Sequence, residues 1–102
     1  MKLDPDLVRK VLSKAEDLPL GEAHGIEVEG HSDDEVTYHV MLLAEAGLLD
    51  ALDVSSHDGV AWLVRRPTYA GHEFLAAAQS DTVWAQAKGW LQKATGAVTS
   101  KV

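Results

Sequence analysis

One segment near the middle of the chain constrains the fold more than any other, because it combines a helix start, an amphipathic helix and a helix stop. It begins with Ser32-Asp33-Asp34-Glu35, where the Ser hydroxyl and the Glu carboxylate can each accept a free backbone N–H of the first turn. Apolar residues follow at helical spacing: Val36, Val40, Leu42 and Leu43. Gly47 can then supply the left-handed turn that ends a helix. We therefore expect a helix over residues 33–46.

A second amphipathic helix is predicted at the start of the chain. Asp4 is suited to cap it, and Pro5 occupies the first helical position, where the missing N–H costs nothing. Apolar residues recur at three- and four-residue steps: Leu7, Val8, Val11, Leu12 and Ala15. The helix should end near Glu16, before Pro19.

Between these helices the helical periodicity is lost and glycines recur. Ile26 and Val28 alternate with Glu27 and Glu29, a pattern that predicts a short strand.

The segment after residue 50 is typical of a β-hairpin followed by helix. Leu52–Val54 and Val60–Val64 are β-prone runs joined by the five-residue connector Ser55–Gly59, which contains an Asp-Gly turn signal. Arg65-Arg66-Pro67 is expected to end the hairpin.

Thr68 can cap a further helix that starts at Tyr69 and runs to about Gln79, with Phe74, Leu75 and Ala78 facing inward. A last helix is expected after residues 80–82.

The predicted order is helix, short strand, helix, β-hairpin, helix, helix, which is an α+β chain with the element order of a winged helix. We expect one domain over residues 1–96 and a flexible tail over residues 97–102.

Amino-acid composition excludes several classes of function for this chain. The 102 residues contain no cysteine, which excludes disulfides, thiolate catalysis and cysteine-ligated metals. No apolar run approaches the length of a membrane span, and the start does not resemble a signal peptide, so we expect a cytoplasmic protein without membrane contact. The net charge of −7 is uneven. Residues 1–59 hold 14 acidic and 4 basic residues, a net −10, whereas residues 60–102 hold 2 and 5, a net +3.

Two resemblances follow from these residues. The run VTYHVMLLAEAGLL, residues 36–49, resembles the recognition helix of bacterial winged-helix repressors of the arsenic-repressor type. The stretches LDPDLVRKVL, IEVEGHSDDEVTYHVMLLAEAGLLDALDV and PTYAGHEFLAAAQSDTVWAQAK resemble the family catalogued as domain of unknown function 2513, a set of small bacterial and phage proteins. That resemblance implies a winged-helix fold and a phage or prophage origin, and it brings no established activity.

The first functional hypothesis is a winged-helix regulator that binds DNA. Its candidate nucleic-acid-binding residues are Thr37, Tyr38 and Met41 on the recognition-type helix, and His57, Arg65 and Arg66 on the hairpin. In the repressors that the helix resembles, the positions that match Thr37, Tyr38 and Met41 usually carry longer polar or basic side chains. Here Asp33, Asp34 and Glu35 surround the helix N-terminus, where they would repel a phosphate.

The second hypothesis is an acidic protein-binding module, such as a phage-encoded inhibitor of the DNA-mimic or anti-CRISPR type, that engages a basic protein surface. Its candidate partner-binding residues are Glu27, Glu29, Asp33, Asp34, Glu35 and Trp90. Trp62 and Trp84 are expected in the core, whereas Trp90 is the best candidate for a partner contact or for the interface of a homodimer.

Neither catalysis nor a cofactor is expected. No nucleophile or phosphate-loop motif is present. His31 with Asp33, or His39 with Asp34, would pair an imidazole with a carboxylate, but the histidines lack the helical two-ligand spacing of a metal site. We therefore predict no metal and no enzyme activity.

Overall fold

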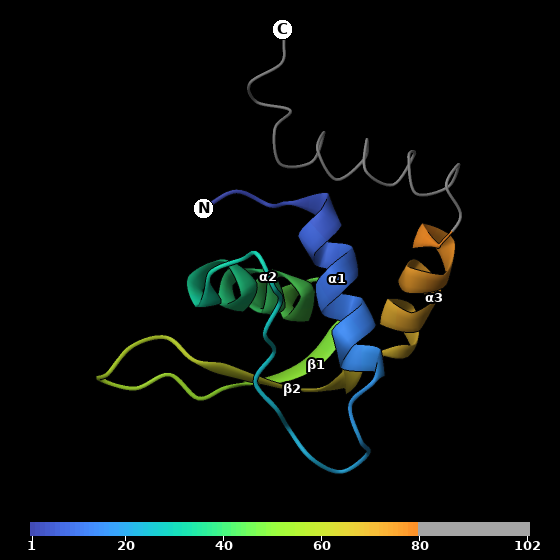
Figure 1. The fold of residues 1–102 in the computed structure, drawn as a ribbon. Coiled ribbons are helices and arrows are strands. Elements are labelled where there is room, and N and C mark those ends of the chain that lie inside the picture. Colours follow the sequence, from blue (N-terminus) through green and yellow to red (C-terminus); the bar gives the residue numbers. More distant parts are fainter. Residues whose placement is uncertain (80–102) are drawn as a thin grey trace, which may run out of the picture.

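The computed structural model describes residues 1–79 of the chain, which form three helices and a two-stranded antiparallel sheet. The elements are α1 (Pro5–Glu16), α2 (Asp33–Glu45), β1 (Leu49–Asp53), β2 (Trp62–Pro67) and α3 (Tyr69–Ala78). The helices lie on one side of the hairpin, with α1 between α2 and α3, and the hairpin tip projects beyond α2 (Figure 1). The described part is therefore α+β, in an arrangement compatible with a winged helix.

Helix α1 forms where the sequence predicts it and supplies the centre of the core. The Asp4 side chain accepts the Asp6 N–H at 3.0 Å and so caps the helix, with Pro5 in the first turn. The five predicted inward residues are all buried: Leu7, Val8, Val11, Leu12 and Ala15.

Helix α2 forms where the sequence predicts a helix. Ser32 and Glu35 form the expected capping box, and Gly47 adopts a positive φ of 79° just after the helix. Val36, Val40 and Leu43 are buried, whereas Leu42 is only partly buried at the edge of the stripe.

The hairpin is present, but its strands differ from the predicted ranges. The first strand starts at Leu49 rather than Leu52, and the second runs over Trp62–Pro67 rather than Val60–Val64. Arg65, Arg66 and Pro67 therefore belong to β2 and do not end it. Pairing extends this far because Leu49 lies opposite Pro67 and Asp50 opposite Arg66, where the two side chains have opposite charges.

The outer part of the hairpin, beyond the two strands, is held by local hydrogen bonds. Val54 N–H donates to the Ala61 carbonyl at 2.8 Å, and Ser56 and Gly59 exchange two backbone hydrogen bonds around the turn. The tip is thus a longer and less regular connection than the predicted five residues.

The predicted strand at residues 26–28 is not formed. Instead, His24 makes a single antiparallel bridge to Val64, through backbone hydrogen bonds of 2.9 and 2.8 Å. Val28 is buried and Ile26 packs against the core, so their alternation with glutamates reflects a segment that lies along the core and pairs with no strand of the described part.

Helix α3 is capped by Thr68, as predicted, and packs directly on the exit of α2. Leu75 and Ala78 are buried, and Phe74 packs partly against the core. Gly71 lies so close to the Leu48 carbonyl that a Cβ would overlap it, which explains the glycine in the Ala-Gly-His-Glu-Phe run.

Trp62, which is predicted to lie in the core, is partly buried and packs against it. The predicted last helix, Trp84, Trp90 and the predicted tail lie outside the described residues. Within residues 1–79, no helix is long and apolar enough to cross a membrane.

Candidate functional site

One buried histidine links α2 to the start of α1. His39 is only 2% exposed, and both of its ring nitrogens bond to backbone groups. Its Nε2 accepts the Asp4 N–H at 2.8 Å, and its Nδ1 lies 2.7 Å from the Glu35 carbonyl oxygen. Because a backbone N–H only donates and a carbonyl only accepts, the imidazole is neutral with its proton on Nδ1. This side chain ties the start of α1 to α2 and lies on the same buried face as Val36, Val40 and Leu43.

The outward face of α2 lines a shallow apolar groove. Asp34, Thr37, Tyr38 and Met41 come from α2, Val60 from the hairpin tip and Met1 from the start of the chain, and the groove encloses about 300 Å³. Val60 and Met1 are 69% and 66% exposed. Three of the six residues predicted to bind DNA, Thr37, Tyr38 and Met41, therefore line one groove, and its other lining residues are apolar or acidic rather than basic.

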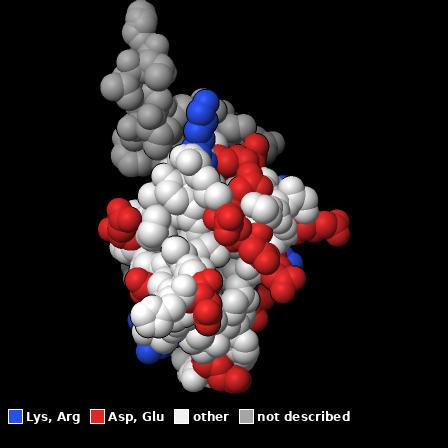
Figure 2. All heavy atoms as spheres, turned by 90° about the vertical axis from the view of Figure 1, so that its left-hand side faces the viewer, with Lys and Arg blue, Asp and Glu red and all other residues white. Residues whose placement is uncertain are grey.

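The N-terminal end of α2 is acidic. Asp33, Asp34 and Glu35 fill its first turn and are all exposed. Figure 2 shows the side of the molecule toward which the hairpin tip projects, where Asp and Glu side chains outnumber Lys and Arg. Carboxylates are favourable at this end of a helix dipole, so the acidic turn is compatible with helix stability while it disfavours a phosphate.

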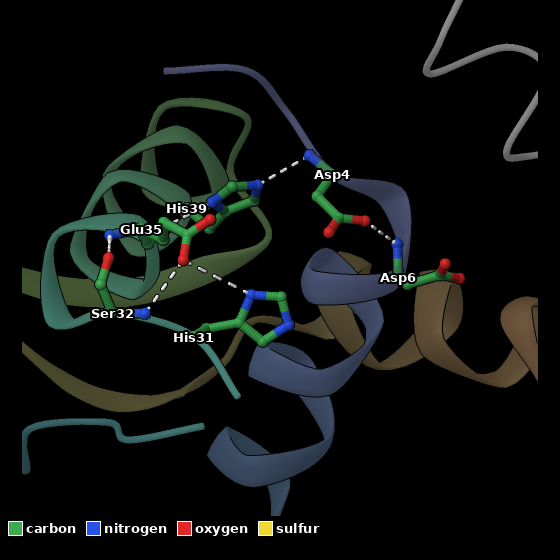
Figure 3. A network of polar contacts seen from close by, with 6 residues as sticks. All are labelled: Asp4, Asp6, His31, Ser32, Glu35 and His39. Atoms are coloured by element: carbon green, nitrogen blue, oxygen red, sulfur yellow. Dashed lines mark hydrogen bonds and ion pairs between the residues drawn. The ribbon is translucent and has the colours of Figure 1, made fainter. Parts of the chain in front are cut away.

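Glu35 has a structural role in addition to its charge. Its Oε1 accepts the Ser32 N–H at 2.9 Å and lies 3.8 Å from Nδ1 of His31 (Figure 3). The hydrogen bond from the Ser32 backbone holds the pKa of Glu35 below its ordinary value, and the nearby His31 lowers the pKa further. The Glu35 carboxylate is therefore part of the helix cap, whereas Asp33 and Asp34 are exposed in the same turn.

The two hairpin arginines share one carboxylate within the molecule. Arg65 Nη1 lies 3.3 Å from Asp50 Oδ1, and Arg66 Nε lies 3.8 Å from Asp50 Oδ2. Consecutive strand residues normally point to opposite faces, but the pairing skips Arg65 between Asp50 and Ala51, a β-bulge that turns both arginines toward Asp50. Neither arginine lines the groove.

The other predicted residues are more scattered. His57 is exposed at the hairpin turn, and Glu27 is exposed in the segment before α2. Glu29 lies beside a separate recess that it shares with Lys10 and Lys14 of α1. Trp90 lies outside the described residues. Of the predicted acidic set, only Asp34 lines the apolar groove.

A metal role for the histidine pairs has no geometric support in residues 1–79, where no group of three or more potential ligands comes together. His39 has both ring nitrogens engaged, and His31 faces Glu35.

Sequence reasoning missed three residues of this region. Val60 was assigned to a strand, although an exposed β-branched residue beside an Asp-Gly turn is a signal for a projecting apolar tip. Met1 carried no signal, because its place depends on how α1 crosses α2. Asp50 was missed because its pairing with the arginines requires a strand that starts at Leu49.

The fold and the groove together define a small α+β domain with an apolar and acidic outward face. The chain belongs to the family described as hypothetical protein (DUF2513), whose family model matches residues 2–97. A protein of Haemophilus influenzae described as uncharacterized is 39% identical over 88 residues, which cover 82% of this chain and 73% of the relative. No solved structure matches the chain. The predicted family is confirmed, whereas the likeness of α2 to a repressor helix stays a prediction.

Proposed function

We propose that this chain is a non-enzymatic regulatory module with a winged-helix arrangement, which binds a basic surface of a protein partner rather than DNA. The observation that carries the proposal is the chemistry of the outward face of α2. Tyr38 and Met41 line a groove with Val60, and Asp34 stands at its side. Aromatic residues and methionine are enriched where proteins contact proteins.

The electrostatics support the same conclusion. DNA affinity depends largely on Lys and Arg that neutralise phosphates. The hairpin arginines already face Asp50, and the first turn of α2 carries three carboxylates. A basic partner meets an opposite charge on this side, which speeds association and selects against acidic partners.

A partner that itself binds nucleic acid would have such a basic surface. In that case the module acts as an inhibitor, because its carboxylates occupy cations that otherwise contact phosphates. The element order, with a hairpin directly after α2, favours a DNA-binding regulator as the second candidate.

A paired measurement tests the proposal. Duplex DNA of mixed sequence is titrated with the full chain at low and physiological salt, and we expect no salt-sensitive binding. Affinity capture from bacterial lysate is then compared between the native chain and the double variant Asp33→Asn/Asp34→Asn, which should lose its partner.

The matched control is Glu22→Gln/Glu73→Gln, which neutralises two exposed carboxylates on other segments and should retain the partner. Salt-sensitive DNA binding, or equal capture by both double variants, would overturn the proposal.

A further inference from the structure

We propose that the groove of α2 receives one apolar side chain from a partner segment that carries Lys or Arg beside it. The proposal rests on the protein-binding function above and specifies the chemistry of the segment that is bound. The groove is the set Met1, Asp34, Thr37, Tyr38, Met41 and Val60.

The lining requires an apolar occupant. Met41 is a flexible and polarisable side chain that adapts to different apolar groups, and Tyr38 offers a rigid ring. Val60 and Met1 stand exposed around the same groove, so an occupant that covers them removes apolar surface from water. A volume of about 300 Å³ is at the lower end for ligand pockets and suits one side chain rather than an extended ligand.

Charge selects the flanking residues. Asp34 lines the groove, with Asp33 next to it in the exposed first turn of α2. Among the described residues, no Lys or Arg lines the groove, so no side-chain cation there competes when a partner cation beside the apolar side chain approaches Asp34. A second copy of this chain is a poor occupant, because each copy carries a net charge of −7.

The chain offers a direct reporter for this groove. It contains two methionines, Met1 and Met41, and both line the groove. A full-length sample labelled with ¹³C at the methionine methyl groups therefore gives two NMR signals that both observe the proposed site. The purification tag belongs at the C-terminus, because Met1 is part of the groove.

The probe is a peptide selected from a random library displayed on phage, with the full chain as bait. We expect enriched sequences to hold a Leu, Met or aromatic residue next to Lys or Arg. The best peptide should shift both methionine methyl signals, and replacing its apolar residue with Ser should weaken binding about tenfold, as for an interface hot spot.

The matched protein variants are Met41→Ser and Leu20→Ser. Met41→Ser removes an apolar side chain of the groove and should weaken the peptide about tenfold. Leu20 is 95% exposed and lines no part of the groove, so Leu20→Ser should bind the peptide as the native chain does.

The outcomes separate this inference from the proposed function. One outcome is that basic peptides leave both methionine signals unmoved and bind Met41→Ser as tightly as the native chain. That outcome overturns the proposal that the groove binds an apolar side chain, but it leaves the proposed acidic protein-binding face intact. Enriched peptides without Lys or Arg, or no enrichment together with salt-sensitive DNA binding, overturn both.

Discussion

The two faces of helix α2 differ in what their side chains do. On the inner face, Val36, Val40 and Leu43 are buried, and His39 bonds to the backbone at the start of α1. On the outer face, Thr37, Tyr38 and Met41 line an open groove. Both faces come from the same 13-residue helix, so buried and groove-lining residues alternate along it, and we propose that stability and recognition are divided in the same way. Substitutions on the two faces should therefore have separable effects.

The largest difference is expected between Leu43→Ala and Met41→Ala. Leu43 is buried, and its truncation should lower the free energy of unfolding by about 2–5 kcal/mol, since a cavity is left in the core. Met41→Ala should cost no more than about 1 kcal/mol, because that side chain is partly exposed. Urea denaturation of both variants measures the difference. Equal costs would show that the groove is part of the core.

A smaller loss of stability is expected for His39→Leu, which keeps an apolar body on the inner face but removes the ring nitrogens. The part-buried Asp4 N–H then loses its acceptor, which should cost about 1 kcal/mol, the lower end of the range for an unsatisfied donor. Hydrogen exchange should be faster at the Asp4 amide in this variant. The neighbouring change Tyr38→Leu on the outer face is the control and should leave that amide protected.

The third prediction concerns whether the hairpin base can supply cations to the outer side. Asp50→Asn removes the carboxylate shared by Arg65 and Arg66, and it should change stability by less than about 1 kcal/mol because the ion pairs are largely exposed. Binding to duplex DNA, which we expect to be absent in the native chain, should rise to a detectable level at low salt as the arginines are released. Asp58→Asn at the hairpin turn changes the net charge equally and should give no such rise. If both variants bind DNA alike, net charge rather than the Asp50 pairing limits binding.

The smallest effect is expected at Glu35, on the border between the two faces. Since its pKa is lowered in the folded chain, its carboxylate stabilises the fold at neutral pH, and this contribution is lost as the pH falls below 4.5 through the lowered pKa. Glu35→Gln retains an acceptor for the Ser32 N–H and should show a flatter dependence of thermal stability on pH in that range. Glu45→Gln, at the other end of α2, should follow the native curve.

Local signals predicted the helices well because helix starts depend on neighbouring residues. Asp4, Ser32 and Thr68 all cap helices as predicted. The strand limits were less predictable, since a strand is determined by its partner. Ile26 and Val28 alternate like a strand but pair with no strand within residues 1–79, and Arg65 to Pro67 extend β2 because Leu49 and Asp50 lie opposite them.

In the candidate site, too, some features could be predicted from nearby residues and others depend on residues distant in sequence. Thr37, Tyr38 and Met41 could be placed on one outward face from the resemblance of this segment to a repressor helix, with which helical spacing is compatible. The sequence could not predict that Met1 and Val60 line the same groove as these three residues. Both are distant in sequence, and they reach the groove because α1 crosses α2 and because the hairpin projects past it.

The sequence by itself determined the three helices with their caps, the acidic character of the first half and the outward position of Thr37, Tyr38 and Met41. These features depend on spacing and on neighbouring residues. Only the tertiary structure decided that the outward face of α2 is an apolar groove and that Asp50 holds both arginines. Both results depend on contacts between residues distant in the chain, and the bulge at Arg65 exists only where β1 pairs with β2.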